Sequence, residues 1–489
     1  MPPILALTLS LTFSFALIVY DRRRSPKTSF ALWIPSVWLF VLGSRSFSAW
    51  MNPGATGGSR AEDLMEGSPV DRAFFLILIA LAVLVLIKRH VSLFEIVYRN
   101  PWLTLFILYA GLSLFWSDFP EVASRRWIKS FGDPLMALIV LTEADPPKAV
   151  ATLFKRVAFV ALPLSVVFIK YFPQLGKSYD SWTGFQFFTG VSTDKNTLGY
   201  LLFAFGLFFF STLISKHGRT AVDGGRSEQA IAAVFLGITI WLFNVSNAKT
   251  ALLCVILACL IYVASGLPRL RRFWGVTVIA GLVVFGILEM TLDFGELLIA
   301  SAGRDTTLTG RTDLWRAVVD LSVNPWVGAG FESFWLGPRL DLLWQDFAFH
   351  PNQAHNGYLE TYLNLGWVGV IALVGLIVGS FRGVQKRWSP DSGGTEADRD
   401  FARFGMACII AAVVYDITEA ALRSMNPFFL VFLIVSMQRP IRASARSPAP
   451  QLAATGARRA TAPGGLAATV TMSVHGRRSP VISSRFRSR

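Results

Sequence analysis

Cationic and titratable side chains stand at the edges of apolar segments in this sequence. Lys195 and Lys249 lie at the start of apolar segments, Arg311 lies in the long polar segment 293–356, and His355 stands near its end. An arginine offers a planar pair of donors to phosphate oxygens, whereas a lysine offers a single positive charge. Together these residue types are suited to a phosphate-bearing ligand.

Two of these residues, Lys195 and Lys249, stand where helices are expected to start. Helices that begin at Asn196 and Lys249 would direct free backbone N–H groups and the positive end of a helix dipole towards the same anion. For any one cation, an anchor at a membrane surface is an equal alternative. The predicted topology places Lys195, Lys249, Arg311 and His355 at the same outer face of the membrane. Four such residues together favour a ligand site over separate anchors.

His355 is the candidate for proton transfer, because imidazole can take or hold a proton near neutral pH. Asn356 follows it, and Glu360 lies about one helical turn further on. A structural histidine is the common alternative for a lone histidine in a loop. His350 lies five residues earlier, but no carboxylate at zinc-site spacing accompanies the pair, so we expect no metal.

The composition identifies the class of protein. Of 489 residues, 53% are hydrophobic and 16% are charged, which is too apolar for the surface of a large soluble protein. The apolar segments recur at spanning length and predict an all-α polytopic membrane protein with about 12 to 13 transmembrane helices. The expected spans are roughly 3–20, 30–49, 73–88, 101–117, 127–142, 154–171, 196–215, 229–245, 249–266, 274–292, 357–381, 403–420 and 427–438.

The net charge of +15 indicates topology rather than nucleic-acid binding. Basic residues cluster in alternate connections, which we expect to face the cytoplasm. The other connections then face outwards, including 172–195 and the loop 293–356. The predicted organisation is transmembrane helices over 1–292, a long extracytoplasmic loop over 293–356, transmembrane helices over 357–438, and a disordered basic cytoplasmic tail over 439–489.

Other polar and aromatic residues allow two interpretations each. Asp416 and Glu419 lie in an apolar segment, where they either pair with Arg423 or an outer cation, or take part in substrate handling. The loop aromatics either stack on sugars or form a loop core and an interfacial belt, which we favour. The segment from Arg311 to Asp320 is expected to be helical.

The motifs occur in an order that resembles a known family. They are Ser192–Gly199 (STDKNTLG), Ser246–Leu253 (SNAKTALL), Gly310-Arg311 with Trp315, Asn324–Gly330 (NPWVGAG), and His355-Asn356 with Leu359-Glu360. This set, with the earlier segment Glu66–Arg72, resembles the O-antigen ligase and Wzy-type polysaccharide polymerase superfamily, in its exopolysaccharide polymerase (ExoQ-like) branch. The resemblance covers most of residues 50–438.

The resemblance implies a metal-independent glycosyltransferase that uses glycan carried on undecaprenyl pyrophosphate, needs no cofactor, and acts at the periplasmic face of the bacterial inner membrane. By carry-over, Arg311 and Lys249 hold the pyrophosphate, and His355 assists the acceptor hydroxyl. Family ligases often carry arginine at the position of Lys249. The lysine keeps the positive charge but cannot contact two phosphate oxygens at once as an arginine can. We therefore predict Arg311 and His355 as catalytic, and as substrate-binding Lys195, Asn196, Lys249, Asn356 and Glu360.

Several functions remain open at this point. The leading hypothesis is a polymerase that joins lipid-linked repeat units into exopolysaccharide or capsule, with a flippase and a chain-length regulator as possible partners. A ligase that transfers finished glycan to a lipid A core uses the same chemistry. A flippase or transporter of lipid-linked sugars also needs cations, but would carry them along a path through the bilayer. A scaffold is the remaining alternative.

Overall fold

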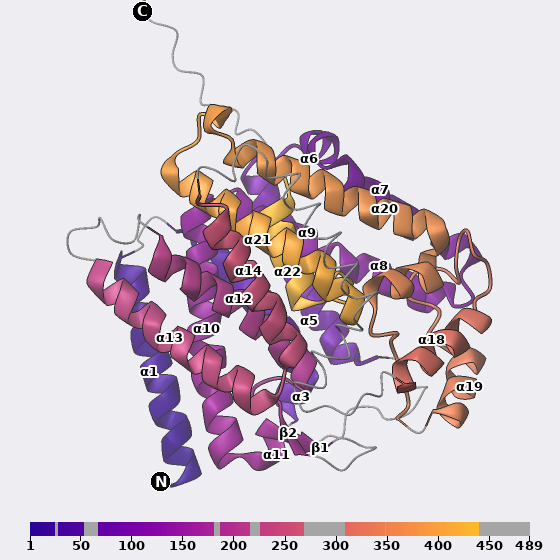
Figure 1. Ribbon diagram of the computed structural model, residues 1–489, viewed down its shortest axis with the longest axis horizontal. Coiled ribbons are helices and arrows are strands. Elements are labelled where there is room, and N and C mark those ends of the chain that lie inside the picture. Colours follow the sequence, from indigo (N-terminus) through magenta and orange to yellow (C-terminus); the bar gives the residue numbers. More distant parts are fainter. Residues whose placement is uncertain are drawn as a thin grey trace, which may run out of the picture. The chain divides into compact units, whose positions relative to one another are not determined.

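The computed structural model describes residues 1–24, 28–52, 67–179, 186–215, 225–267, 309–347 and 349–439. This part of the chain is an all-α polytopic membrane protein, as the sequence predicts, with one added hairpin of β1 (Lys177–Tyr179) and β2 (Gln186–Phe188) (Figure 1). The expected span 274–292, the start of the predicted outer loop and the predicted tail beyond Arg439 lie outside the described residues.

Seven helices in the described ranges are long and apolar enough to cross a membrane. They are α1 (Pro3–Arg24), α5 (Pro69–Lys88), α10 (Pro146–Tyr171), α12 (Lys195–Ile214), α13 (Gly225–Ser246), α20 (Gly357–Trp388) and α21 (Glu396–Thr418). Four shorter apolar segments are η1 (Phe30–Leu32) with α2 (Trp33–Gly43), α7 (Pro101–Leu112) with η2 (Ser113–Trp116), α14 (Lys249–Ala264) and α22 (Pro427–Ser436).

Short elements connect these spans. They are α3 (Phe47–Met51), α6 (Leu93–Arg99), α8 (Pro120–Ser130), α9 (Gly132–Leu141), α11 (Pro173–Gly176), α18 (Thr309–Asp320), α19 (Pro338–Asp346) and η4 (Pro390–Ser392). In Figure 1, α20 runs alongside α7, and α18 and α19 lie beyond the end at which α20 begins.

Capping residues define several helix starts. Asp194 precedes α12, and its carboxylate accepts from the N–H groups of Asn196 and Thr197 at 2.9 Å. Asn356 caps α20 by accepting from the Leu359 N–H at 3.0 Å. Such side chains satisfy donors that the first helical turn leaves without a partner, so these helices begin where the sequence places an Asp or Asn.

Ionic contacts join the helix ends at one face, which we call the Arg89 face. Arg89 pairs with Glu143, Lys155 with Asp21 at 3.1 Å and Glu228 at 3.0 Å, and Arg439 with Asp398 at 2.7 Å. The starts of α12 and α20 lie at the opposite face, which we call the His355 face. Arg89, Lys155 and Arg439 belong to segments that the sequence predicts to face the cytoplasm, and other basic connections, including 269–272, lie outside the described residues.

The predicted span 127–142 is two helices, α8 and α9, which meet at Phe131. The physical reason is Pro134, which has no N–H to donate to the carbonyl of Ser130 one turn earlier. Each helix is too short to cross a bilayer by itself, since 10 residues of α9 extend about 15 Å against a hydrocarbon core of about 30 Å.

The helix α20 is also interrupted, at Gly366, whose φ is 62°. The break frees two carbonyls of the helix for other donors. Leu363 O accepts from the Ala329 N–H at 3.0 Å, and Asn364 O accepts from the Gly330 N–H at 2.9 Å. Both donors belong to the motif Asn324–Gly330, so this motif serves to close the backbone hydrogen bonds of a broken membrane helix.

A hydrophobic cluster separate from the main core of the membrane helices holds the polar segment before α20 together. It comprises Leu314, Val318, Ala329, Phe334, Trp335, Leu340, Leu343, Ala354 and Leu363. The expected helix is present as α18, and the Trp315 indole donates to Ala354 O at 2.8 Å. Phe334 and Trp335 are buried, as a loop core requires, whereas Trp326 is exposed.

We expect Gly366→Ala to lower the free energy of unfolding by about 1–3 kcal/mol, because a side chain resists a positive φ. The added Cβ would also lie 2.2 Å from the Trp326 carbonyl. Thermal unfolding in detergent measures the effect. The matched control is Gly237→Ala in α13, where no atom lies within 4 Å of the new Cβ. Equal stability of the two variants would contradict this account of the break.

Candidate active site

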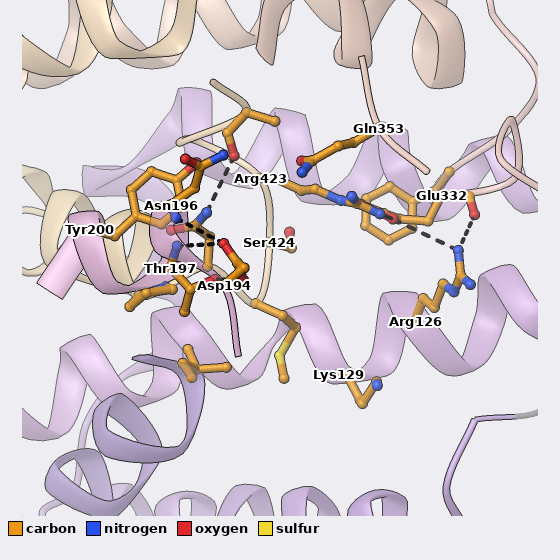
Figure 2. Close-up of a pocket in the computed structure, with 16 residues that line it drawn as sticks. Arg126, Lys129, Asp194, Asn196, Thr197, Tyr200, Glu332, Gln353, Arg423 and Ser424 are labelled. Carbon is orange, nitrogen blue, oxygen red and sulfur yellow. Dashed lines mark hydrogen bonds and ion pairs between the residues drawn. The ribbon is translucent and has the colours of Figure 1, made fainter. Parts of the chain in front are cut away.

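A cavity of about 340 Å³ opens at the His355 face, and we call it the Arg423 cavity. Its lining comes from the end of α2, from α8, from the first two turns of α12, from the loops on either side of α19, and from the connection between α21 and α22. The polar and charged members are Arg126, Lys129, Asp194, Asn196, Thr197, Tyr200, Glu332, Gln353, Arg423, Ser424 and Asn426. Figure 2 shows Asp194 and Asn196 across the cavity from Arg126, with Arg423 extending towards Glu332.

Glu332 is held between two arginines. The Arg423 guanidinium donates to both carboxylate oxygens, with Nε 2.8 Å from Oε1. Arg126 Nη1 donates to the Glu332 backbone carbonyl at 2.6 Å and lies 3.8 Å from Oε2. A guanidinium that contacts both oxygens of a carboxylate is equally suited to the oxygens of a phosphate.

These contacts determine the charge states of Glu332 and Arg423. Burial alone raises the pKa of Glu332, but the charges of Arg423 and Arg126 outweigh it and hold this pKa below its ordinary value of 4.5. Burial alone lowers the pKa of Arg423, and the Glu332 carboxylate reverses this and raises it. Both residues are therefore charged at neutral pH.

Two short helices meet near the cavity, and one of them, α22, reaches its wall through Pro427. The 10-residue helix α22 packs against α9, and both begin at the level of Asp133. The Asp133 carboxylate accepts from the Met425 N–H at 2.8 Å and from the Trp38 indole at 2.8 Å. Each helix extends only about 15 Å, which is about half of a hydrocarbon core of roughly 30 Å.

His355 lies beside the cavity, since Gln353 precedes it by two residues and lines the wall. Its Nδ1 lies 2.9 Å from Oε2 of Glu419, which is buried at the end of α21 next to the lining residue Ala420. The His355 side chain keeps 26% of its surface exposed. Its backbone is left-handed, with φ 49°. A buried carboxylate thus orients an accessible imidazole.

The structure brings some of the predicted site residues together. Asn196 lines the cavity, and Asn356 caps α20 directly after His355. Lys195 begins α12, with its ammonium 5.1 Å from the centre of the Phe187 ring. Lys249 begins α14, which packs against α12. Neither lysine is among the residues that line the cavity.

The remaining two predicted residues are placed differently. Glu360 is buried within α20, where its carboxylate accepts from the Trp335 indole at 2.8 Å and from the Ala354 N–H at 3.0 Å. These bonds attach the loop to the helix. Arg311 lies in the first turn of α18, one turn before Trp315, and its side chain is outside the described part of the structure.

The sequence prediction missed Arg126, Lys129 and Glu332, and named Arg423 only as a partner for Asp416 or Glu419. In the structure Arg423 pairs with Glu332, while Asp416 accepts from the Leu422 N–H at 2.9 Å. One signal was available, because cations inside an otherwise apolar segment are costly unless they face a polar interior.

Comparison with known proteins confirms the family resemblance. Residues 232–374, from α13 to the middle of α20, match the family model described as O-antigen ligase. The chain is also similar to the exopolysaccharide production protein ExoQ of Rhizobium meliloti, with 27% identity over 303 residues. That alignment covers 58% of this chain and 65% of ExoQ, so the chain matches less than two thirds of its relative.

We expect Glu332→Gln to destabilise the protein, because it leaves the buried Arg423 charge without its partner. The pKa of Glu332 is lowered in the folded state, so its contribution is present above the ordinary value of 4.5 and is lost as the pH falls below it. Thermal unfolding should therefore separate the wild type from the variant at pH 7 and bring them together in acid. A separation unchanged at low pH would contradict the ion pair.

Proposed function

We propose that this protein is a membrane glycosyltransferase of the polymerase type. It joins oligosaccharide repeat units carried on undecaprenyl pyrophosphate into an exopolysaccharide or capsule chain, with no metal and no cofactor. The reaction takes place at the His355 face, which lies on the periplasmic side of a bacterial inner membrane. A flippase that supplies the repeat unit and a regulator of chain length are its proposed partners.

The observation that carries this proposal is the pairing of a cationic cavity with an oriented histidine at one membrane face. Arg126, Lys129 and Arg423 provide positive charge for a diphosphate. His355, bound to Glu419, provides a proton acceptor beside them. The match to the O-antigen ligase family and the similarity to ExoQ support the choice of a lipid-linked glycan as substrate.

The proposed chemistry follows from these groups. A hydroxyl oxygen of the acceptor sugar attacks the anomeric carbon of the donor, and the bond from that carbon to the diphosphate oxygen breaks. The lipid diphosphate leaves with the electron pair, and cations at this face stabilise the charge that develops on it. Because Nδ1 of His355 is engaged by Glu419, Nε2 is the nitrogen available to take the hydroxyl proton.

The distribution of charge supports the proposed orientation. Arg89, Lys155 and Arg439 lie at the opposite face, among the ionic contacts that join the helix ends there. An excess of lysine and arginine in short connections marks the cytoplasmic side of helical membrane proteins. The His355 face is then periplasmic, which is the side on which the proposed polymerisation takes place.

A ligase is the second candidate, because the matched family model is itself described as O-antigen ligase. It would use the same donor and the same leaving group, and would differ only in transferring the glycan to a lipid A core. Neighbouring genes for a flippase, a length regulator and export would favour the polymerase. Neighbouring genes for lipid A core synthesis would favour the ligase.

The decisive experiment incubates the purified full-length protein in lipid with a lipid-linked repeat unit. A polymerase yields a ladder of longer lipid-linked products, and a ligase yields a single product only when an acceptor lipid is added. With a verified substrate, the absence of both products would exclude the enzyme.

We predict that Arg311→Ala damages this reaction more than His355→Ala. The arginine would stabilise the departing diphosphate, whereas a general base typically contributes about 100- to 10,000-fold, so the histidine variant should retain a trace of activity. Initial rates of ladder formation measure both losses. Equal losses, or a larger loss for His355→Ala, would count against these roles.

Glu419 is proposed as a positioning residue for His355, so Glu419→Gln should lower the rate of ladder formation. In the His355→Ala background the same change should cause almost no further loss, because the group that it orients is absent. Glu419→Asp should retain part of the rate that Glu419→Gln loses, because it keeps a carboxylate at this position. Losses that multiply in the double variant would show a structural role independent of His355.

A further inference from the structure

A groove of about 680 Å³, which we call the Phe119 groove, opens at the same membrane face as the Arg423 cavity. Its polar lining comes from Arg72 in the first turn of α5, from Asp118 before α8, and from Glu121 and Arg125 on α8. The Phe119 ring forms part of its wall. The helix α5 ends at the Arg89 face, so its first turn lies at the His355 face. No step of the proposed reaction uses these side chains.

We propose that the Phe119 groove binds the oligosaccharide part of the lipid-linked substrate, at sugars beyond the one attached to the diphosphate. This inference rests on the proposed function, because the oligosaccharide is a ligand only if the substrate is a lipid-linked glycan. The sugars belong to the donor or to the acceptor, which are chemically the same repeat unit in a polymerase.

The groove and the Arg423 cavity adjoin each other along α8. Glu121 and Arg125 line the groove, whereas Arg126 and Lys129 line the cavity. Burial lowers the pKa of Lys129, and the charges of Arg126 and Arg72 lower it further, so charges of the cavity and of the groove lie close together. A glycan that begins at the cavity therefore reaches the groove with sugars further along its chain.

The polar groups of the groove match the hydroxyls of a sugar. A hydroxyl both donates and accepts hydrogen bonds, whereas a carboxylate only accepts and a guanidinium only donates. Glu121 and Arg125 lie one helical turn apart on α8. Among the residues that the structure describes, neither the Glu121 carboxylate nor the Arg125 guanidinium has a hydrogen-bond or ion-pair partner. Neighbouring hydroxyls of one sugar can bind to both groups.

The Glu121 carboxylate also distinguishes the groove from a phosphate site. A phosphate is negatively charged, so a carboxylate that no cation pairs repels it. The Phe119 ring supplies apolar surface, against which the C–H groups of a sugar ring can pack. The volume of about 680 Å³ lies in the ordinary range of ligand sites. A hydroxyl-rich glycan therefore fits the groove better than a second phosphate group.

The groove is held in shape by the loop that also lines the cavity. The Asp118 carboxylate accepts from Arg339 at 2.5 Å, which joins the start of α8 to the start of α19. The Arg339 guanidinium lies 5.4 Å from the centre of the buried Phe334 ring. Gly337 has φ 59° and approaches Phe119 so closely that an added Cβ would lie 2.5 Å from the ring. A preorganised surface of this kind loses little conformational freedom when a ligand binds.

The test measures the binding of two separate probes to the purified full-length protein by ligand-observed NMR. One probe is inorganic pyrophosphate, and the other is the free oligosaccharide released by mild acid from the lipid-linked repeat unit. Glu121→Gln and Arg125→Gln should each weaken oligosaccharide binding by roughly three- to tenfold, the loss of about one hydrogen bond, and leave pyrophosphate binding unchanged. Lys129→Gln should show the reverse pattern.

The matched control is Arg316→Gln, which removes a largely exposed cation of α18 and should leave both probes unaffected. Thermal unfolding checks that each variant is folded. The proposal is overturned if the wild type binds no oligosaccharide, or if both groove variants bind it as the wild type does. Equal weakening of pyrophosphate in the groove variants, or an equal loss in Arg316→Gln, would overturn it as well.

Two partial substrates identify which glycan lies in the groove. A lipid-linked unit with a blocked non-reducing end can act only as a donor, and the free oligosaccharide, which has no leaving group, can act only as an acceptor. A raised KM with unchanged kcat in Glu121→Gln for the blocked unit assigns the groove to the donor. The same change for the free oligosaccharide assigns it to the acceptor. An unchanged KM for both would overturn the groove.

Binding and transfer fail separately in this design. A product ladder together with oligosaccharide binding that ignores both groove variants would overturn the groove and leave the polymerase standing. Oligosaccharide binding that depends on Glu121 and Arg125, without a ladder or any transfer, would overturn the polymerase and support the groove.

Discussion

A backbone group inside a membrane has no water to bind, so each interruption of a helix there needs a partner from the protein. This constraint explains most of the unusual features of the chain. The break at Gly366 leaves Leu363 O and Asn364 O to accept from Ala329 and Gly330, which draws the polar loop onto the end of α20. The loop is thereby fixed against the membrane domain rather than suspended above it.

The short helices also bear on the site. The Asp133 carboxylate near the start of α9 accepts from the Met425 N–H just before α22, and Met425 lines the Arg423 cavity. Charges in a membrane protein are costly unless they are paired or face a polar cavity. Arg423 satisfies the condition through Glu332, and the pair joins the α21–α22 connection to the loop. Packing and proposed chemistry thus depend on the same contacts.

The sequence predicted the site unevenly. Asn196 and His355 were found because each stands at the start of an apolar segment, and both reach the same region. Glu360 was found by the same reasoning, yet its carboxylate serves to attach Trp335 and Ala354. Arg126 and Lys129 were missed, because the sequence predicts one continuous span over 127–142 and a linear pattern does not show that this span is broken.

The amino-acid sequence by itself determined the class of protein, the approximate spans and the family resemblance, because these depend on composition, segment length and local motifs. Only the tertiary structure decided which charges meet. The partner of Arg423 lies 91 residues away and that of His355 lies 64 residues away, across separate helices. Pairing at such separations is set by helix packing and by breaks at Phe131 and Gly366, which no local pattern records.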